Sequence, residues 1–106
     1  MKAPGALEVD VLLAVARHDD RAYGLLVLDD VSAARGRQYS VGAIYTTLSR
    51  LEAKGLLSSR TTEPLPMRGG RSRRQYRLTA AARTVLTAER DRTLQRWTGE
   101  PQWGLA

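Results

Sequence analysis

Residues 40–57 decide the fold, and they read SVGAIYTTLSRLEAKGLL. Ser40 is a favourable helix N-cap and Gly55 is a common residue just beyond a helix end, so this stretch predicts a helix over residues 41–54. Three large apolar residues fall within about 60° of one another around that helix and form its predicted core face: Ile44, Leu48 and Leu51. The opposite face carries small and polar residues: Gly42, Thr46, Ser49, Arg50 and Ala53.

This polar face suits a helix that enters the major groove of DNA. Small residues let the backbone approach the floor of a groove, while Thr46, Ser49 and Arg50 can donate to base edges or phosphates. Tyr45 lies on the flank, where its hydroxyl can reach a phosphate. The predicted DNA contacts of the helix and its N-cap are Ser40, Gly42, Tyr45, Thr46, Ser49 and Arg50. The alternative is an ordinary amphipathic surface helix, which would more often carry Glu and Lys on this face.

The patterns on either side predict a winged helix-turn-helix fold, mainly α with a small β-hairpin, plus a C-terminal dimerisation helix. In chain order they indicate helices over 7–16 and 23–34, strands over 56–62 and 75–78, and a last helix over 80–98. The predicted domains are a DNA-binding domain over 1–79, a dimerisation helix over 80–98 and a tail over 99–106.

The loop between the two predicted strands is strongly basic. Four arginines surround Gly69-Gly70 with no acidic residue among them: Arg68, Arg71, Arg73 and Arg74. A glycine-tipped hairpin can lie along a minor groove of DNA, where arginine is favoured. We therefore predict DNA contacts at Arg68, Gly70, Arg71, Arg73 and Arg74. The alternative is a flexible loop that serves only solubility.

Charge and composition narrow the function classes. The net charge is +6, and residues 31–79 hold ten basic side chains against two acidic ones, whereas residues 1–30 hold three basic against six acidic. An arginine-rich middle is typical of a protein that binds a polyanion, although a solvated surface in an arginine-rich proteome is an alternative. The chain has no cysteine, no apolar run of membrane-spanning length and no signal-peptide pattern at its start. We expect a cytoplasmic chain with no membrane partner, associated with the nucleoid when bound to DNA.

Few residues support an enzyme or a metalloprotein. The single histidine, His18, precedes Asp19 and Asp20 in a predicted turn, and no second histidine or cysteine exists to complete a metal site. No serine is flanked by the glycines of a nucleophile elbow. We expect no catalytic residue, no metal and no cofactor. Two alternatives to a sequence-specific DNA-binding regulator stay open: a winged-helix protein-interaction module, and a non-specific binder of RNA or DNA.

Three segments together resemble the PadR family of bacterial transcriptional regulators: Tyr23-Gly24, residues 42–57 and residues 69–79. The resemblance covers most of residues 7–86, and the third-helix block is its most specific part. The chain departs from the family pattern at Ala82, where glycine is frequent, and at Pro64-Leu65-Pro66 before the wing. The resemblance implies a homodimeric repressor whose third helices and wings contact operator DNA, with a single C-terminal dimerisation helix.

The last predicted helix carries a narrow apolar stripe that needs a partner. Its members are Ala82, Leu86, Thr93, Leu94 and Trp97. We predict that Leu86, Leu94 and Trp97 lie at the interface of a symmetric homodimer, which would place two recognition helices about 34 Å apart on a palindromic site. The alternative is packing against the first helix of the same chain. Trp97 is also the predicted wall of a pocket for a small aromatic effector, because indole is flat, apolar and able to stack.

Overall fold

The computed structural model describes residues 3–18, 22–62 and 73–99, and its elements follow the predicted order. They are α1 (Ala6–His18), β1 (Ala22–Tyr23), α2 (Gly24–Arg35), α3 (Val41–Ala53), β2 (Leu57–Thr61), β3 (Arg74–Leu78) and α4 (Ala80–Arg96). Three packed helices followed by an antiparallel hairpin and a fourth helix make a winged helix-turn-helix, so the predicted fold class is confirmed.

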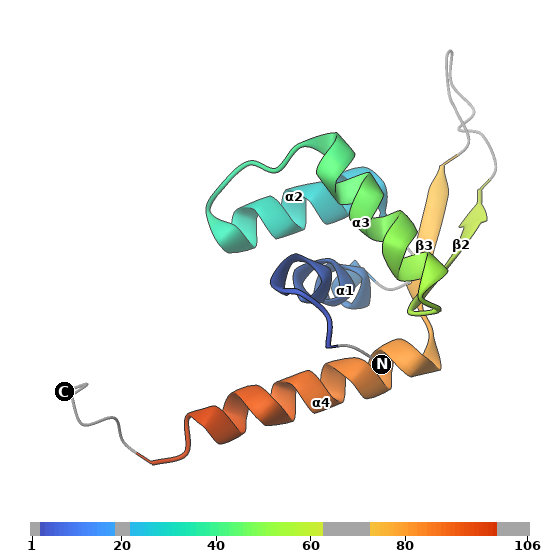
Figure 1. Ribbon diagram of the computed structural model, residues 1–106. Helices are drawn as coiled ribbons and strands as arrows, with labels where there is room; N and C mark the ends of the chain where they lie inside the picture. The colour runs from blue at the N-terminus through green and yellow to red at the C-terminus, as the bar shows by residue number, and fades with distance from the viewer. Residues whose placement is uncertain (1–2, 19–21, 63–72, 100–106) are drawn as a thin grey trace.

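The core forms where α1, α2 and α3 meet the sheet. In Figure 1, α1 lies between α4 on one side and α2 and α3 on the other. The predicted core face of α3 is confirmed, because Ile44, Leu48 and Leu51 are fully buried. They pack with buried apolar residues of the other elements, among them Val11, Leu12, Val15, Val27, Val31, Leu56, Leu57 and Tyr76. Burial of these side chains fixes which face of α3 remains in solvent.

The sheet has one strand more than the sequence predicted. Strands β2 and β3 form the expected antiparallel hairpin, in which Leu57 lies opposite Leu78 and Thr61 opposite Arg74. Strand β1 pairs with the other edge of β3, so that the order is β1-β3-β2. The second helix was expected to begin near Tyr23, and it begins at Gly24: Tyr23 lies in β1 and is the N-cap of α2. A two-residue strand carries no periodic pattern, and only its pairing partner defines it.

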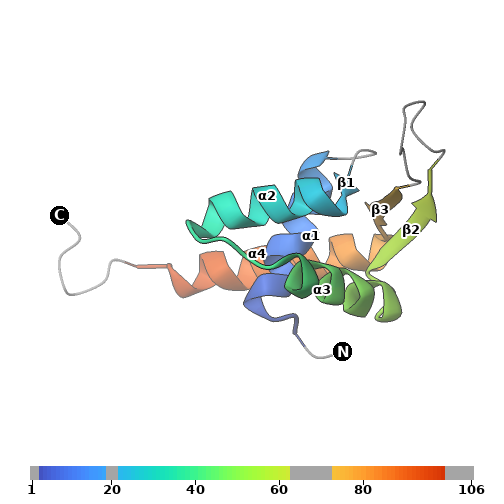
Figure 2. The same cartoon turned by 90° about the horizontal axis from the view of Figure 1, so that it is seen from above.

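Helix α4 joins the core only through its first turns. The Thr79 hydroxyl accepts from the Ala82 N–H at 3.2 Å and donates to the Gly55 carbonyl at 2.7 Å, which ties the start of α4 to the end of α3. Ala82 is buried and Leu86 is half-buried, whereas most of the later residues of the helix are exposed. The helix runs along the side of α1 that is turned away from α2 and α3 in Figure 1, and it passes behind α1 in Figure 2. The helix ends at Arg96, two residues before the predicted end, and Trp97 is its C-cap.

Candidate nucleic-acid interface

The start of α3 is organised by Ser40. Its side-chain oxygen accepts a hydrogen bond from the Ala43 N–H at 3.0 Å, as expected of an N-cap. The first turn beyond it is open: Gly42 is exposed, and a Cβ added there would meet no atom within 4 Å. A partner can therefore approach the backbone of α3 closely at Gly42, beside the exposed side chain of Val41.

The predicted recognition residues lie together on the exposed face of α3. Tyr45, Thr46, Ser49, Arg50 and Ala53 line a shallow hollow of about 440 Å³, and all five are exposed. Three hydroxyl groups and one guanidinium supply hydrogen-bond donors there, and no carboxylate is among the described residues that line the hollow. This arrangement offers donors to the acceptor-rich edges of bases and to phosphates.

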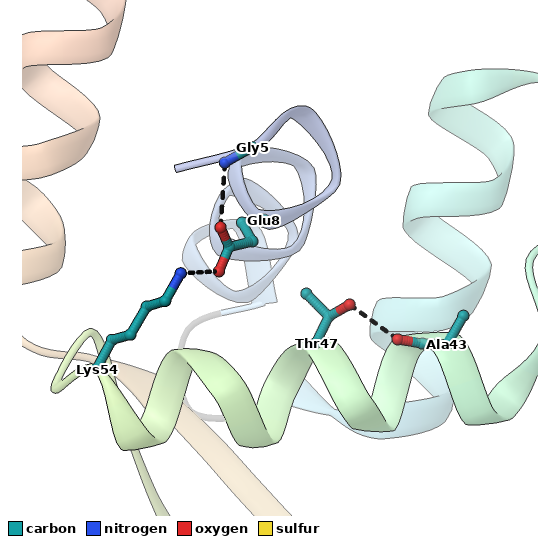
Figure 3. Close-up of polar contacts among 5 residues, drawn as sticks. All are labelled: Gly5, Glu8, Ala43, Thr47 and Lys54. Carbon is teal, nitrogen blue, oxygen red and sulfur yellow. Dashed lines mark hydrogen bonds and ion pairs between the residues drawn. The ribbon is translucent and has the colours of Figure 1, made fainter. Parts of the chain in front are cut away.

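Two polar contacts involve α3 (Figure 3): one joins its C-terminal end to α1, and the other lies within the helix. At its C-terminal end, Lys54 Nζ donates to Glu8 Oε2 at 2.7 Å, and the other oxygen of Glu8 accepts from the Gly5 N–H at 3.1 Å. The bond from Lys54 keeps the pKa of Glu8 below its usual value. Near the start of the helix, the buried Thr47 hydroxyl donates to the Ala43 carbonyl at 2.8 Å. The first contact joins α3 to α1, so the recognition face has a fixed orientation relative to the core.

The position of Tyr45 explains why glycine stands at position 24. A Cβ built on Gly24 would overlap the hydroxyl and the ring of Tyr45, so the ring lies directly against the start of α2. Tyr45 is nevertheless 38% exposed. The side chain therefore sets the approach of α2 to α3 and still leaves part of its surface exposed.

The base of the wing is described by the structure, and its tip is not. The backbone carbonyl of Arg73 accepts from the Thr62 N–H at 2.7 Å and from the Thr62 hydroxyl at 3.0 Å, which closes the hairpin below the tip. The Arg73 guanidinium lies 5.4 Å from the centre of the Tyr23 ring, while Arg74 Nη1 donates to Ser59 Oγ at 2.9 Å. Neighbouring arginines thus point to opposite faces of the sheet, as strand alternation predicts. The predicted contacts Arg68, Gly70 and Arg71 lie outside the described residues, as does Pro64-Leu65-Pro66.

Sequence reasoning missed Arg37 as a candidate. The sequence interpretation treated Arg37 only as part of the stop after the second helix. In the structure its guanidinium stacks 4.7 Å from the centre of the Tyr39 ring, in the turn that leads to Ser40 and α3. An exposed arginine beside an aromatic residue, immediately before a recognition helix, is the signal that could have identified it.

The predicted interface residues of α4 separate into two groups. Leu86 and Leu94 line an apolar groove of about 440 Å³ between α4 and α1, together with Val9 and Leu13 of α1. Trp97 does not line this groove; it stands at the end of α4 and is 60% exposed. The structure thus places Leu86 and Leu94 at one surface with α1 and leaves Trp97 at its outer end.

Other kinds of site find no support in the described part of the chain. None of its helices is both long and apolar enough to cross a membrane. Within residues 3–18, 22–62 and 73–99, no group of three or more His, Cys, Asp or Glu side chains is arranged to hold a metal ion.

Comparison with known proteins agrees with this geometry. The model of the transcriptional regulator PadR-like family matches residues 12–88. Transcriptional regulator Rv3488 of Mycobacterium tuberculosis is 39% identical over 82 residues, which cover 76% of this chain and 72% of that protein. The crystal structure of a PadR family transcription regulator from Clostridium difficile R20291 has a TM-score of 0.67 and 24% identity, covering 87% of this chain and 93% of that one. RosR of H. salinarum has a TM-score of 0.73 and 21% identity, covering 94% and 83%. The protein therefore belongs to the PadR-like family of transcriptional regulators, and it is a DNA-binding regulator and not an enzyme.

Proposed function

We propose that this regulator is a homodimeric repressor that binds a palindromic operator with α3 and the wing of each protomer. The observation that carries the proposal is the exposed face of α3, where Thr46, Ser49 and Arg50 lie together without an acidic neighbour in the hollow that they line. The excess of basic side chains over residues 31–79 supports a polyanionic partner.

The contacts divide into those that read sequence and those that position the protein. Thr46, Ser49 and Arg50 face the bases of the major groove, since a guanidinium can bind guanine in a bidentate manner. Ser40, Gly42 and Tyr45 approach the backbone near the start of α3. The wing follows the adjacent minor groove with its predicted arginines and Gly70: Arg68, Arg71, Arg73 and Arg74. Arg37 is an additional phosphate contact from the turn between α2 and α3.

The proposed dimer rests on the apolar groove between α1 and α4. Its apolar lining residues are Val9, Leu13, Leu86 and Leu94, accompanied by Thr87, Glu89, Arg90 and Thr93. Leu94 is 62% exposed in the single chain. A second copy of α4 has an apolar stripe of matching chemistry and length, and a two-fold axis lets each helix fill the partner's groove. Such an arrangement places the two recognition helices about 34 Å apart, which is one turn of DNA.

The proposed effector is a small planar aromatic molecule that stacks on Trp97. The support is chemical: an indole 60% exposed beside an apolar groove is a suitable stacking surface at a two-fold axis. Titration with such a molecule should quench Trp97 fluorescence and release DNA, and the Trp97→Phe variant should lose both responses. Quenching without release of DNA would contradict an effector role.

The proposed function is tested by comparing three nucleic acids. We expect the full chain to bind the duplex upstream of its own gene more tightly than random duplex DNA, and random DNA more tightly than double-stranded RNA. Equal affinity for both DNA duplexes would favour the non-specific binder, and binding to none of the three would favour the protein-interaction module. Nuclease protection should show a bound site with two-fold symmetry. A protected site that lacks this symmetry and is bound by a monomer would contradict the palindromic dimer.

A further inference from the structure

A chain of three polar side chains connects the recognition helix to both strands of the wing. Ser59 Oγ, on β2, donates to Oε2 of Glu52 at 2.7 Å, and Glu52 lies in the last turn of α3. The same Ser59 oxygen accepts from Nη1 of Arg74 at 2.9 Å, and Arg74 is the first residue of β3. One hydroxyl group therefore contacts all three elements that form the proposed DNA-binding surface.

The direction of both hydrogen bonds follows from the chemistry of the groups. A guanidinium has no acceptor, so Arg74 must donate, and an ionised carboxylate has no donor, so Glu52 must accept. Ser59 has a single proton, and the only assignment that satisfies both neighbours gives this proton to Glu52 and leaves a lone pair for Arg74. The negative charge of Glu52 thus supports the bond to Arg74 through the hydroxyl group.

The register of the hairpin explains why these residues meet. Ser59 lies opposite Tyr76 and Thr61 lies opposite Arg74, so Ser59 and Arg74 are diagonal neighbours on the face of the sheet that is turned toward α3. Residues of the other face make their own contact, since Arg60 Nε donates to Gln75 Oε1 at 3.0 Å. Ser58 belongs to that other face and is exposed.

We propose that Ser59 and Glu52 are positioning residues that orient Arg74 for contact with DNA; this inference rests on the proposed function. Arg74 is exposed, and it lies at the start of β3, where Gln75 and Tyr76 after it are buried. A free arginine side chain loses conformational entropy when it binds a phosphate, and an orientation fixed in advance reduces that loss. The bond to Ser59 engages one of the five guanidinium hydrogens and leaves the others available for a phosphate.

The test uses the full chain and a fluorescein-labelled random duplex, because phosphate contacts do not depend on sequence. Ser59→Ala should weaken binding about three- to tenfold, which is the usual contribution of one hydrogen bond. The slope of log K against log salt should become less steep by up to about 0.9, the contribution of one phosphate contact. Ser59→Thr keeps the hydroxyl group and should bind like the parent protein. Ser58→Ala makes the same change on the opposite face of the same strand and is the matched control.

A double-mutant cycle decides whether Ser59 acts through Arg74. Once Arg74→Ala is present, Ser59→Ala should cause no further loss of affinity or of salt dependence. A Ser59→Ala effect of the same size in both backgrounds would overturn the inference, as would a Ser59→Ala variant that binds like the parent protein. Failure of the proposed function looks different: the parent chain would bind neither duplex, or would bind the random duplex as tightly as the duplex upstream of its own gene, whatever the effect of Ser59→Ala.

Thermal unfolding separates positioning from a general loss of structure. We expect Ser59→Ala to keep a cooperative unfolding transition. Its affinity for DNA should remain reduced even when binding is measured well below its unfolding temperature. If Ser59→Ala does not fold, Glu52→Gln gives the second test. Removal of a negative charge alone would raise the affinity for DNA, whereas loss of positioning would lower it. The lowering of affinity should disappear in the Arg74→Ala background. An increase in affinity of equal size in both backgrounds would overturn the inference.

Discussion

At the scale of single residues, two glycines at the starts of helices have opposite roles. Gly24 leaves the space that the ring of Tyr45 occupies, whereas a Cβ on Gly42 would meet no atom within 4 Å. Both residues lie in the first turn of a helix, so intrinsic helix preference affects them alike. The difference between them therefore reports the contact between α2 and α3.

Gly24→Ala should lower the free energy of unfolding by about 1–3 kcal/mol, because the added methyl group displaces a packed ring. Gly42→Ala is the matched control, and it should leave stability unchanged or raise it by up to about 1 kcal/mol, since alanine restricts the unfolded chain more than glycine does. Urea unfolding of the two variants measures both quantities. Equal effects would show that Tyr45 does not pack against Gly24 in solution.

Arg50→Ala should weaken binding to the operator more than binding to random DNA. A lost bidentate base contact costs about 1–3 kcal/mol, whereas a lost phosphate contact weakens binding to all sequences alike. Arg92→Ala removes the same charge from α4 and serves as the control, because α4 lies on the other side of α1 from α3 (Figure 1). Equal losses on both duplexes would reassign Arg50 to the phosphates.

At the scale of elements, ion pairs account for half of the acidic side chains in the first thirty residues. Glu8 of α1 pairs with Lys54 beyond α3, and Asp10 of α1 accepts from Nε of Arg35 on α2 at 2.5 Å. The bond to Asp10 also raises the pKa of Arg35. A further pair, Arg17 Nη1 to Asp30 Oδ2 at 2.5 Å, joins α1 to α2. Three of the six acidic side chains of this segment thus serve as counterions between elements of the core.

The pair of Glu8 and Lys54 predicts a pH dependence of stability. Because the hydrogen bond from Lys54 lowers the folded pKa of Glu8, the contribution is present above the unfolded pKa of about 4.3 and is lost as the pH falls through the folded value. Glu8→Gln, which retains an acceptor for the Gly5 N–H, should be less stable than the parent by at most about 1 kcal/mol at neutral pH. Urea unfolding near pH 2 should show no difference, and a difference that is constant with pH would contradict the assignment.

Periodic patterns in the sequence predicted the helices well, but they did not predict the contacts between segments that are distant in the chain. The alternation of Ile44, Leu48 and Leu51 with polar residues defined both faces of α3, because helical burial has a period that one sequence displays. Strand β1 and the bond between Ser59 and Arg74 could not be predicted in the same way. Each depends on the register between segments that are far apart in the chain, which a local pattern does not contain.

At the scale of the whole molecule, α4 links the proposed dimer to the DNA-binding surface. Its first residues are joined to the end of α3 through Thr79 and Gly55, while its outer half carries Leu94 and leads to Trp97. A partner docked on α4 would therefore influence the distance between two recognition helices through the junction of α4 with the end of α3. The spacing of the half-sites then depends on α4 as much as on α3.

Leu94→Glu should convert the proposed dimer into a folded monomer. Leu94 is 62% exposed in the single chain, so a carboxylate there costs the monomer little, but it would lie uncompensated in an apolar interface. Gln95→Glu places the same charge on the next residue, turned by about 100° around the helix, and should remain dimeric. Analytical ultracentrifugation gives the mass of each variant. The emission of Trp97, taken as the difference from Trp97→Phe, should shift to longer wavelength in Leu94→Glu alone.

Because two linked sites bind more tightly than one, the affinity of Leu94→Glu for a palindromic duplex should fall by about 100-fold or more, while a duplex with one half-site is bound as before. A Leu94→Glu variant that keeps the parent's mass and its affinity for the palindrome would show that α4 does not form the dimer.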